Sequence, residues 1–361
     1  MTRVYIVGGG VIARAHAHGA RLVVPQLELH VTEPNPTALK LFLDENPDAQ
    51  SHASLAKMLT HQPARATDIV IVATPPWTHR DLTLEAIASG RSVLCEKPLA
   101  MNIADARQML AAAKAAGVHL GDCSMRFFGY GAGEALKSEL AAGKLGQLYH
   151  ITSRHLIQRG RSGVEYQPET RWFLDRAKAG GGVLYDWAVY DLSTLFDVVR
   201  PSAVRVHHAW TARPTTQIDP TDVAIDVEHA VGAAMSLRIG NRWVPFTYER
   251  ASITHGTEVL LMELEGTTGA ATWQWLPWTD DETSVTMSHD DRGKIERQTL
   301  GFTSAGETNF HHRPLKYFHE LLLGKDSLAL VNEAALSYFE VIDAIYASAR
   351  DDAPREIEIQ Y

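Results

Sequence analysis

The chain of 361 residues has only two cysteines, which argues against a disulfide-rich fold and against a cysteine-based zinc site. Cys95 and Cys123 are too few for a disulfide framework. No CxxC or HExxH pattern indicates a zinc site, and the histidine pairs at 207–208 and 311–312 lack the spacing that puts two ligands on one face of a helix or strand. We therefore expect no bound metal.

Long apolar runs and clusters of basic residues are also missing. Stretches such as Ile69 to Ala73 are far shorter than the ~20 residues that span a bilayer, and the N-terminus lacks a signal-peptide core. The net charge is -9, so the chain lacks the electrostatic footprint of a protein that binds nucleic acid or an anionic membrane. We expect a cytoplasmic protein that binds a small molecule, with no nucleic-acid or membrane partner.

The composition is that of a folded globular protein, with 45% hydrophobic and 21% charged residues. The length favours two domains with separate cores. The first 122 residues are balanced in charge and contain one of the eight tryptophans, whereas the remainder carries the whole net charge and the other seven. We predict a first domain over 1–122 and a second over 123–361.

A glycine turn follows the first apolar run. Val4 to Val7 leads into the pattern G-x-G-x-x-A, in which Gly8 permits a tight turn, Gly10 lets the backbone approach a pyrophosphate and Ala13 allows close packing of helix on strand. The helix that begins at Val11 and Ile12 offers free N–H groups to the phosphates. The pattern predicts a dinucleotide site, although a glycine turn by itself can be merely structural.

An acidic residue stands where an adenosine ribose should bind. Glu33 ends the second apolar stretch, Leu27 to Val31, and lies about 20 residues beyond the glycines. A carboxylate accepts hydrogen bonds from a ribose 2′-OH but repels a 2′-phosphate, and no arginine follows in the next four residues. We therefore expect NAD in preference to NADP.

Alternating strand and helix patterns continue through the first domain. Apolar strands at Asp68 to Thr74 and Ser92 to Cys95 precede helices at about His79 to Ser89 and Ile103 to Ala116. This alternation predicts an α/β domain with a doubly wound parallel sheet, a Rossmann fold.

The segment 70–100, VIVATPPWTHRDLTLEAIASGRSVLCEKPLA, resembles the Gfo/Idh/MocA family, named for glucose-fructose oxidoreductase, inositol dehydrogenase and MocA. The specific part is Glu96-Lys97-Pro98. Further agreement lies in VGGGVIARAHA at the start, SMRFFG at 124–129, GKLGQLYH at 143–150 and AGGGVLYDWAVYDLS at 179–193. The resemblance implies that Lys97 contacts both cofactor and substrate. We extend the expected cofactor contacts to four further positions: Thr74, Pro75, His79 and Glu96.

A second motif carries the expected proton chemistry. The usual family pattern has Asp at 186, Gly at 188, His at 190 and Asp at 193, whereas this chain has Asp186, Ala188, Tyr190 and Ser193. Tyrosine at 190 resembles the branch with glucose-fructose oxidoreductase and the dihydrodiol and xylose dehydrogenases, which implies Tyr190 as the proton-transfer group. A phenol of pKa ~10 needs a nearby cation, so we expect Lys97 to assist Tyr190. On one helix over Val183 to Val199, Asp186 and Tyr190 would share a face, and Asp186 would hold the substrate hydroxyl or orient the lysine.

The second domain reads as α+β, with an open and mostly antiparallel sheet. Strand patterns recur without intervening helices at 148–155, 203–211, 230–239, 244–253, 258–265, 269–276, 284–288 and 295–300. The resemblance implies that one sheet face packs on helices and the other forms a subunit interface, giving a homodimer or homotetramer. Trp243, Trp273 and Trp275 fit either that interface or the core. The helix in 332–349 can pack back onto the first domain.

The polar, arginine-rich segment Leu156 to Trp172 is expected to frame the substrate pocket. Aromatic faces bind the C–H surfaces of sugars and charged groups bind their hydroxyls, so we name Arg126, Tyr166 and Trp172 as substrate contacts beside Lys97, Asp186 and Tyr190.

The first functional hypothesis is an NAD(H)-dependent oxidoreductase acting on a secondary alcohol of a sugar, sugar derivative or cyclitol. Two alternatives stay open. One is glycoside cleavage by transient oxidation and elimination with a retained NAD. The other is a non-catalytic, dinucleotide-sensing regulator.

Overall fold

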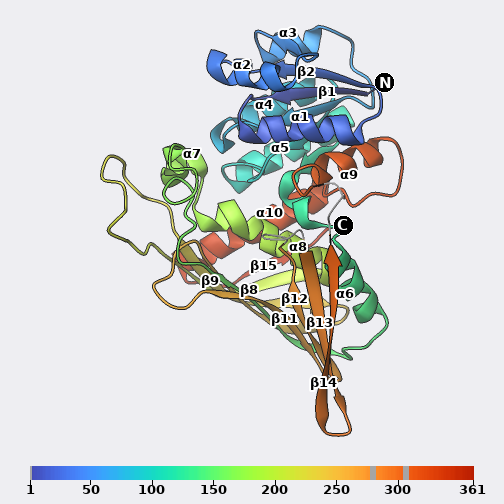
Figure 1. Cartoon of the computed structure of the whole chain (residues 1–361), viewed down its shortest axis with the longest axis vertical. Coiled ribbons are helices and arrows are strands. Elements are labelled where there is room, and N and C mark those ends of the chain that lie inside the picture. The colour runs from blue at the N-terminus through green and yellow to red at the C-terminus, as the bar shows by residue number, and fades with distance from the viewer. Residues whose placement is uncertain (1, 277–281, 304–308) are drawn as a thin grey trace. The chain divides into compact units, whose positions relative to one another are not determined.

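The computed structural model describes residues 2–276, 282–303 and 309–361 and divides into two compact units (Figure 1). Unit 1 comprises residues 1–126 and 308–339, and unit 2 comprises 127–307 and 340–361. The predicted domain boundary after Asp122 stays a prediction, because these units divide after Arg126 and residues 308–339 belong with unit 1. Trp278 lies outside the described residues.

The core of unit 1 is a parallel sheet of six strands in the order β3-β2-β1-β4-β5-β6. This is the strand order of the doubly wound dinucleotide-binding fold and confirms the predicted class. The strands are β1 (Thr2–Val7), β2 (Leu27–Thr32), β3 (Gln50–His52), β4 (Ile69–Val72), β5 (Ser92–Cys95) and β6 (Leu120–Asp122). Strands β1, β4 and β5 are buried throughout, as expected for parallel strands covered on both faces.

Among the described residues of unit 1, the α-helices that lie wholly within it are α1 (Val11–Val23), α2 (Pro36–Glu45), α3 (Leu55–Thr60), α4 (His79–Ala88), α5 (Ile103–Ala116) and α9 (Arg313–Leu322). Local capping explains two boundaries of α5: the Asn102 side chain accepts the Asp105 N–H, and Gly117 ends the helix with a left-handed φ of 66°. Helix α2 was not predicted, although Asn35 caps it and Pro36 starts it. Helix α10 (Asn332–Asp351) crosses the division between the units.

Unit 2 is built on a nine-stranded sheet in the order β14-β13-β12-β11-β7-β10-β9-β8-β15, in which the described pairs are antiparallel except β7 with β10. This confirms the predicted open, mostly antiparallel sheet. Its strands are β7 (Leu148–Leu156), β8 (Ala203–Ala212), β9 (Ala230–Ile239), β10 (Arg242–Ala251), β11 (Val259–Gly266), β12 (Gly269–Gln274), β13 (Glu282–Asp291), β14 (Lys294–Thr303) and β15 (Arg355–Glu358). The β13–β14 hairpin extends as a long ribbon in Figure 1.

The remaining helical segments of unit 2 are α6 (Gly131–Ala141), η3 (Arg171–Leu174), α7 (Arg176–Ala179), η4 (Leu184–Ala188) and α8 (Val189–Val199). Every residue of α8 is buried, so this helix needs partners on all sides. Trp273 and Trp275 are also buried inside the unit, which favours the core alternative for these two residues. The predicted subunit interface stays a prediction.

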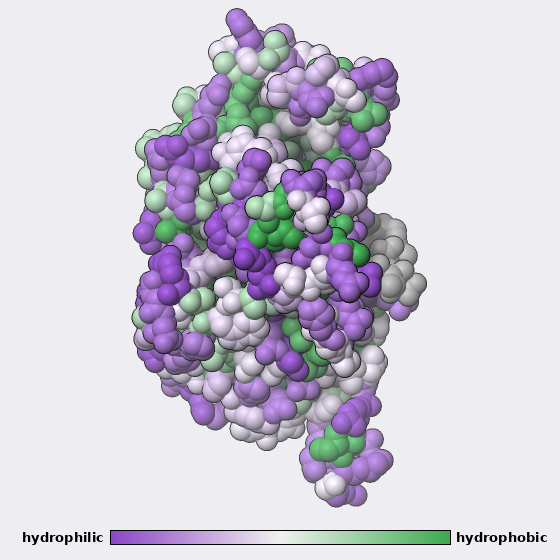
Figure 2. All heavy atoms as spheres, turned by 90° about the vertical axis from the view of Figure 1, so that its left-hand side faces the viewer, coloured by the Kyte–Doolittle hydropathy of each residue, from purple (hydrophilic) through white to green (hydrophobic). Residues whose placement is uncertain are grey.

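The surface is mainly hydrophilic on the face shown in Figure 2, where green hydrophobic residues form small separate patches. Such scattered apolar residues are ordinary on a protein surface. In the part of the chain that the structure describes, no helix combines the length and apolarity required to cross a membrane.

A buried ion pair fastens α8 to the sheet. Arg250 on β10 donates to Asp191 Oδ1 at 2.8 Å, and the Tyr248 hydroxyl donates to Asp191 Oδ2 at 2.8 Å. Both charged side chains are 1% exposed. Burial raises the pKa of Asp191, and Arg250 opposes that rise. The pair therefore fixes the helix that carries Tyr190.

Removal of this arginine should destabilise the chain strongly. Arg250→Met leaves the Asp191 carboxylate buried without its cation, and we expect the free energy of unfolding to fall by about 3–5 kcal/mol. The matched control is Arg350→Met, because Arg350 is exposed and pairs with Asp351, and its free energy of unfolding should stay close to that of the wild type. Urea denaturation of both variants measures the difference, and similar losses would contradict this account.

Candidate active site

The glycine turn after β1 has the geometry that a dinucleotide requires. Gly8 has φ 110°, and a Cβ there would stand 2.6 Å from the Ala73 carbonyl oxygen, so only glycine fits. A Cβ on Gly10 would meet nothing within 4 Å, which leaves open space at the start of α1. No acidic residue lies in the first turn of α1, and Val11 is exposed. Exposed N–H groups beside open space fit a pyrophosphate.

The Glu33 carboxylate lies directly against this turn. Oε2 accepts the Gly9 N–H and Oε1 accepts the Asn35 N–H, each at 2.7 Å. A carboxylate has about four acceptor positions, so these bonds fix its orientation and leave capacity for ribose hydroxyls. The residues around the turn therefore fit the adenosine half of NAD.

The segment after β4 contains three predicted cofactor contacts: Thr74, Pro75 and His79. The first two are partly accessible, whereas the third is buried. The Thr78 hydroxyl donates to Thr74 Oγ1 at 2.7 Å. His79 is fully buried, with Nδ1 2.9 Å from the Pro98 carbonyl and Nε2 2.8 Å from the Thr74 carbonyl. Burial lowers the pKa of His79. In this geometry His79 ties the segment after β4 to the turn after β5, so an effect of His79 on cofactor would be indirect.

Glu96, directly after β5, is the centre of a buried charged cluster. His16 on α1 lies 2.6 Å from Glu96 Oε1, Arg126 donates to the same oxygen, and the Lys97 N–H donates to Oε2 at 3.2 Å. Burial raises the pKa of Glu96, but Arg126, His16 and Lys97 outweigh burial and hold that pKa well below its usual range. The ionised carboxylate thus fixes the backbone from which the partly buried Lys97 extends.

Three potential ligand atoms of His16, Glu96 and Cys123 lie within 4.8 Å of one another. Arg126 already supplies the cation that neutralises Glu96, and burial raises the pKa of the Cys123 thiol well above its usual value. The cluster is therefore better explained as a charge-balanced support for the Glu96-Lys97 turn. Sequence reasoning missed His16, whose place on α1 carries no distinctive spacing to Glu96.

The helix that carries the second motif differs from the prediction. Leu184–Ala188 forms a π-helix, and the α-helix begins only at Val189. The helical segment therefore runs over 183–199 as expected but contains a wider turn, and the expectation that Asp186 and Tyr190 share a face stays a prediction. Short π segments inside helices are frequent at functional sites. Tyr190 is 3% exposed and meets the rings of Phe127 and Trp187 edge-on.

The glycine triplet before this helix passes directly over Glu228. A Cβ on Gly182 would lie 1.8 Å from the Glu228 carbonyl oxygen, which requires glycine there. Glu228 Oε1 accepts the N–H groups of Gly182 at 2.9 Å and Leu184 at 3.2 Å. The carboxylate satisfies free donors at a helix start, where negative charge is favourable. This contact positions the backbone directly before Asp186.

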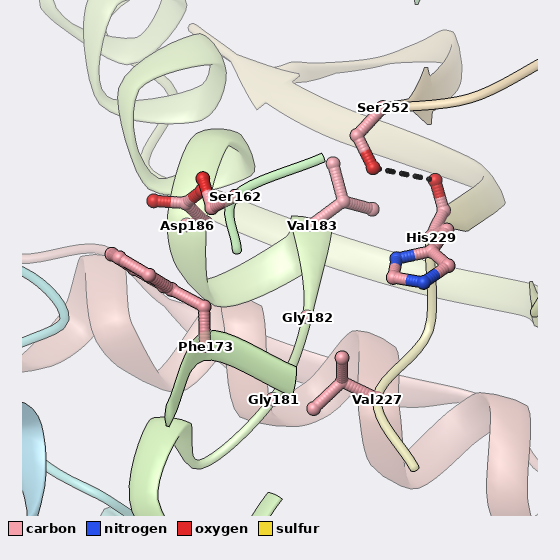
Figure 3. A pocket seen from close by; sticks show the side chains of 9 residues that line it. All are labelled: Ser162, Phe173, Gly181, Gly182, Val183, Asp186, Val227, His229 and Ser252. Atoms are coloured by element: carbon pink, nitrogen blue, oxygen red, sulfur yellow. Dashed lines mark hydrogen bonds between the residues drawn. The ribbon is translucent and has the colours of Figure 1, made fainter. Parts of the chain in front are cut away.

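A small pocket of about 20 Å³ opens beside Asp186, and we name it the Asp186 pocket (Figure 3). This space admits a single small polar group such as a hydroxyl. The Ser162 hydroxyl donates to Asp186 Oδ2 at 2.6 Å. The pocket is lined by Ser162, Phe173, Gly181, Gly182, Val183, Asp186, Val227, His229 and Ser252, all from unit 2. Of the predicted substrate contacts, only Asp186 lines it.

The other predicted substrate contacts have different environments. Tyr166 is 55% exposed, Trp172 stacks on Phe173 with ring centroids 3.8 Å apart, and Arg126 is buried against Glu96. Their roles in substrate binding stay predictions. The segment 156–172 does reach the Asp186 pocket, but through Ser162, a residue that sequence reasoning did not single out.

Two family models match the chain. Residues 2–121 match the oxidoreductase family with an NAD-binding Rossmann fold, and residues 137–357 match its C-terminal alpha/beta domain. The chain belongs to the Gfo/Idh/MocA family of oxidoreductases. The resemblance inferred from the sequence motifs is thereby confirmed, as is the expectation of an NAD-binding fold.

Similar curated proteins include a reductase and a dehydrogenase. 1,5-Anhydro-D-fructose reductase of Ensifer adhaerens is 32% identical over 58% of this chain and 61% of its own length. Trans-1,2-dihydrobenzene-1,2-diol dehydrogenase of Bos taurus is 31% identical over 44% of each chain. The matches thus span less than two thirds of these relatives.

Solved structures of the same family share the fold. Levoglucosan dehydrogenase in complex with NADH and L-sorbose has a TM-score of 0.77 at 19% identity and covers 99% of both chains. Aldose-aldose oxidoreductase of Caulobacter crescentus, complexed with glycerol, has a TM-score of 0.74 at 22% identity and covers 99% of both.

Glu33→Gln tests the predicted cofactor preference. The variant keeps a side-chain oxygen that can accept the Gly9 N–H but loses the charge, so we expect NADH to bind about tenfold more weakly and discrimination against NADPH to fall. Fluorescence titration with each nucleotide measures both effects. Asp44→Asn, an exposed residue of α2 paired with Lys40, is the control. An unchanged ratio of NADH to NADPH affinity in Glu33→Gln would show that Glu33 does not set this preference.

Proposed function

We propose that this chain is an NAD(H)-dependent oxidoreductase that interconverts a secondary alcohol and a ketone on a sugar, sugar derivative or cyclitol. The observation that carries the proposal is the Asp186 pocket, in a chain whose family is defined by an NAD-binding Rossmann fold. When bound, the nicotinamide accepts or supplies the hydride. The relatives named as anhydrofructose reductase and dihydrodiol dehydrogenase support the same class of reaction.

The lining of the Asp186 pocket favours a neutral, hydroxyl-rich ligand. Among the described residues that line it are one carboxylate, two serines and a histidine, but no lysine or arginine. Phe173, Val183 and Val227 provide apolar surface for the C–H groups of a sugar or cyclitol. An anionic substrate would meet the Asp186 charge without a compensating cation from this lining.

We assign the proton chemistry to Tyr190 and Lys97. A phenol must lose its proton to act as a base, and a nearby ammonium lowers the cost of the tyrosinate. Asp186 would accept a hydrogen bond from a substrate hydroxyl while Ser162 fixes its orientation. The buried Glu96 cluster would hold the backbone of Lys97 during the reaction.

Stopped-flow absorbance at the NADH band, with NAD and a panel of polyols, tests the proposed reaction. We expect NADH to form with at least one neutral polyol. Product analysis with aryl glycosides separates the glycoside-cleaving alternative, because cleavage without net NADH formation contradicts a simple dehydrogenase. Calorimetric binding of NAD without turnover of any ligand would instead favour the regulatory alternative.

Lys97→Ala should lower kcat/KM at least 100-fold on the best polyol of that panel, because it removes the cation proposed to support Tyr190. Lys40→Ala is the matched control, since Lys40 is an exposed lysine on α2. Steady-state NADH absorbance measures both variants. A Lys97→Ala enzyme with wild-type kinetics would remove Lys97 from the mechanism.

A further inference from the structure

His229 is a buried polar side chain that the proposed chemistry does not yet use. The residue is 3% exposed, and its Nε2 has no hydrogen-bond partner among the described residues. Leaving a buried donor or acceptor unpaired is destabilising, and such groups in native proteins call for an explanation. His229 lines the Asp186 pocket, and Figure 3 shows its ring on the side of the view opposite Ser162 and Asp186.

The backbone around His229 is fixed on several sides. Its N–H donates to the Ala212 carbonyl at 2.9 Å, and its own carbonyl accepts the N–H of Ser252 at 2.9 Å. The preceding residue, Glu228, accepts the N–H groups of Gly182 and Leu184, at the start of the helical segment that carries Asp186. The backbone of His229 is therefore held by hydrogen bonds to Ala212 and Ser252, and the adjacent Glu228 carboxylate holds the segment that leads to Asp186. A preorganised binding site requires such fixed supports.

The imidazole of His229 is suited to recognising a hydroxyl. Burial and the charge of Arg161 together lower the pKa of His229 to about 4, against the opposite effects of Asp219 and Glu165. At neutral pH the ring is therefore uncharged and has one N–H donor and one acceptor nitrogen. A hydroxyl can pair with either, whereas a free cation or anion gains no charge partner from this ring.

We propose that His229 is a substrate-binding residue whose Nε2 hydrogen-bonds a hydroxyl of the polyol held against Asp186 and Ser162. This inference rests on the proposed function and deepens it, because it places a second polar anchor in the same pocket. With Asp186 and His229 both contacting hydroxyls, the pocket selects a neutral ligand that carries at least two of them. Phe173, Val183 and Val227 would pack on its C–H faces.

The test uses the full chain saturated with NADH and titrated calorimetrically with methyl glucoside, methyl xyloside, myo-inositol and their monodeoxy derivatives. None of these ligands has a free carbonyl group that NADH could reduce, so the titration measures binding alone. In the wild-type chain, one monodeoxy derivative should bind about tenfold more weakly than its parent, since it lacks the hydroxyl that meets His229. In His229→Phe, parent and derivative should bind equally.

Thermal stability separates a binding role from a structural one. Phe replaces the unpartnered nitrogen with apolar surface, so His229→Phe should have a Tm equal to or above that of the wild type while it loses affinity. His229→Gln keeps an amide that can meet a hydroxyl and should retain part of the discrimination, which also keeps the test usable if His229→Phe does not fold. His289→Gln, an exposed histidine on β13, should match the wild type throughout.

Three results would overturn the inference. These are wild-type affinities in both His229 variants, an equal loss for parent and derivative together with a lower Tm, and no binding of any panel member by the wild-type chain. Failure of the proposed function gives a different pattern: polyols bind with dependence on His229, but no NADH forms when NAD replaces NADH.

Discussion

The burial of one carboxylate constrains the predicted catalytic region of unit 1. Glu96 lies in the interior at the end of β5, where an unpaired charge would be very costly, so the chain must bring cations to it. His16 comes from α1 and Arg126 from the segment after β6, and both meet the same carboxylate oxygen. The cluster therefore links the helix of the glycine turn to the turn that carries Lys97. A change in one of these elements has to be accommodated by the others.

In unit 2, buried carboxylates are likewise paired with donors, and these pairs fix the elements around Asp186. Asp191 is neutralised by Arg250, which fastens α8 to β10, and Glu228 accepts the backbone N–H groups before that helix. Between these two anchors lies the π-helix with Asp186. Fixed acids on either side leave little freedom for the Asp186 pocket. His229 lines this pocket, and its buried Nε2 has no hydrogen-bond partner in the part of the chain that the structure describes. An unsatisfied group in a rigid pocket is what a site prepared for a polar ligand would show.

The sequence predicted the fold well because its signals are local. Continuous apolar runs marked the buried parallel strands, Gly8 and Gly10 marked the first turn, and the strand series of unit 2 followed from alternation. The site was harder to predict, because its contacts join distant residues. Nothing in the spacing of His16 and Glu96, or of Ser162, Asp186 and His229, indicates that they meet. The π-helix also could not be predicted from a helical pattern, since the same residue types form an α-helix or a π-helix.

The central claim is that a hydride passes directly between the carbinol carbon of a polyol and the nicotinamide. Oxidation of the best substrate, deuterated at its secondary carbinol carbon, followed by NMR of the reduced cofactor, tests this claim most directly. The account predicts one deuterium at nicotinamide C4 for each substrate oxidised, with none released to water. Deuterium that appears in the solvent, with only protium transferred to the cofactor, would contradict it.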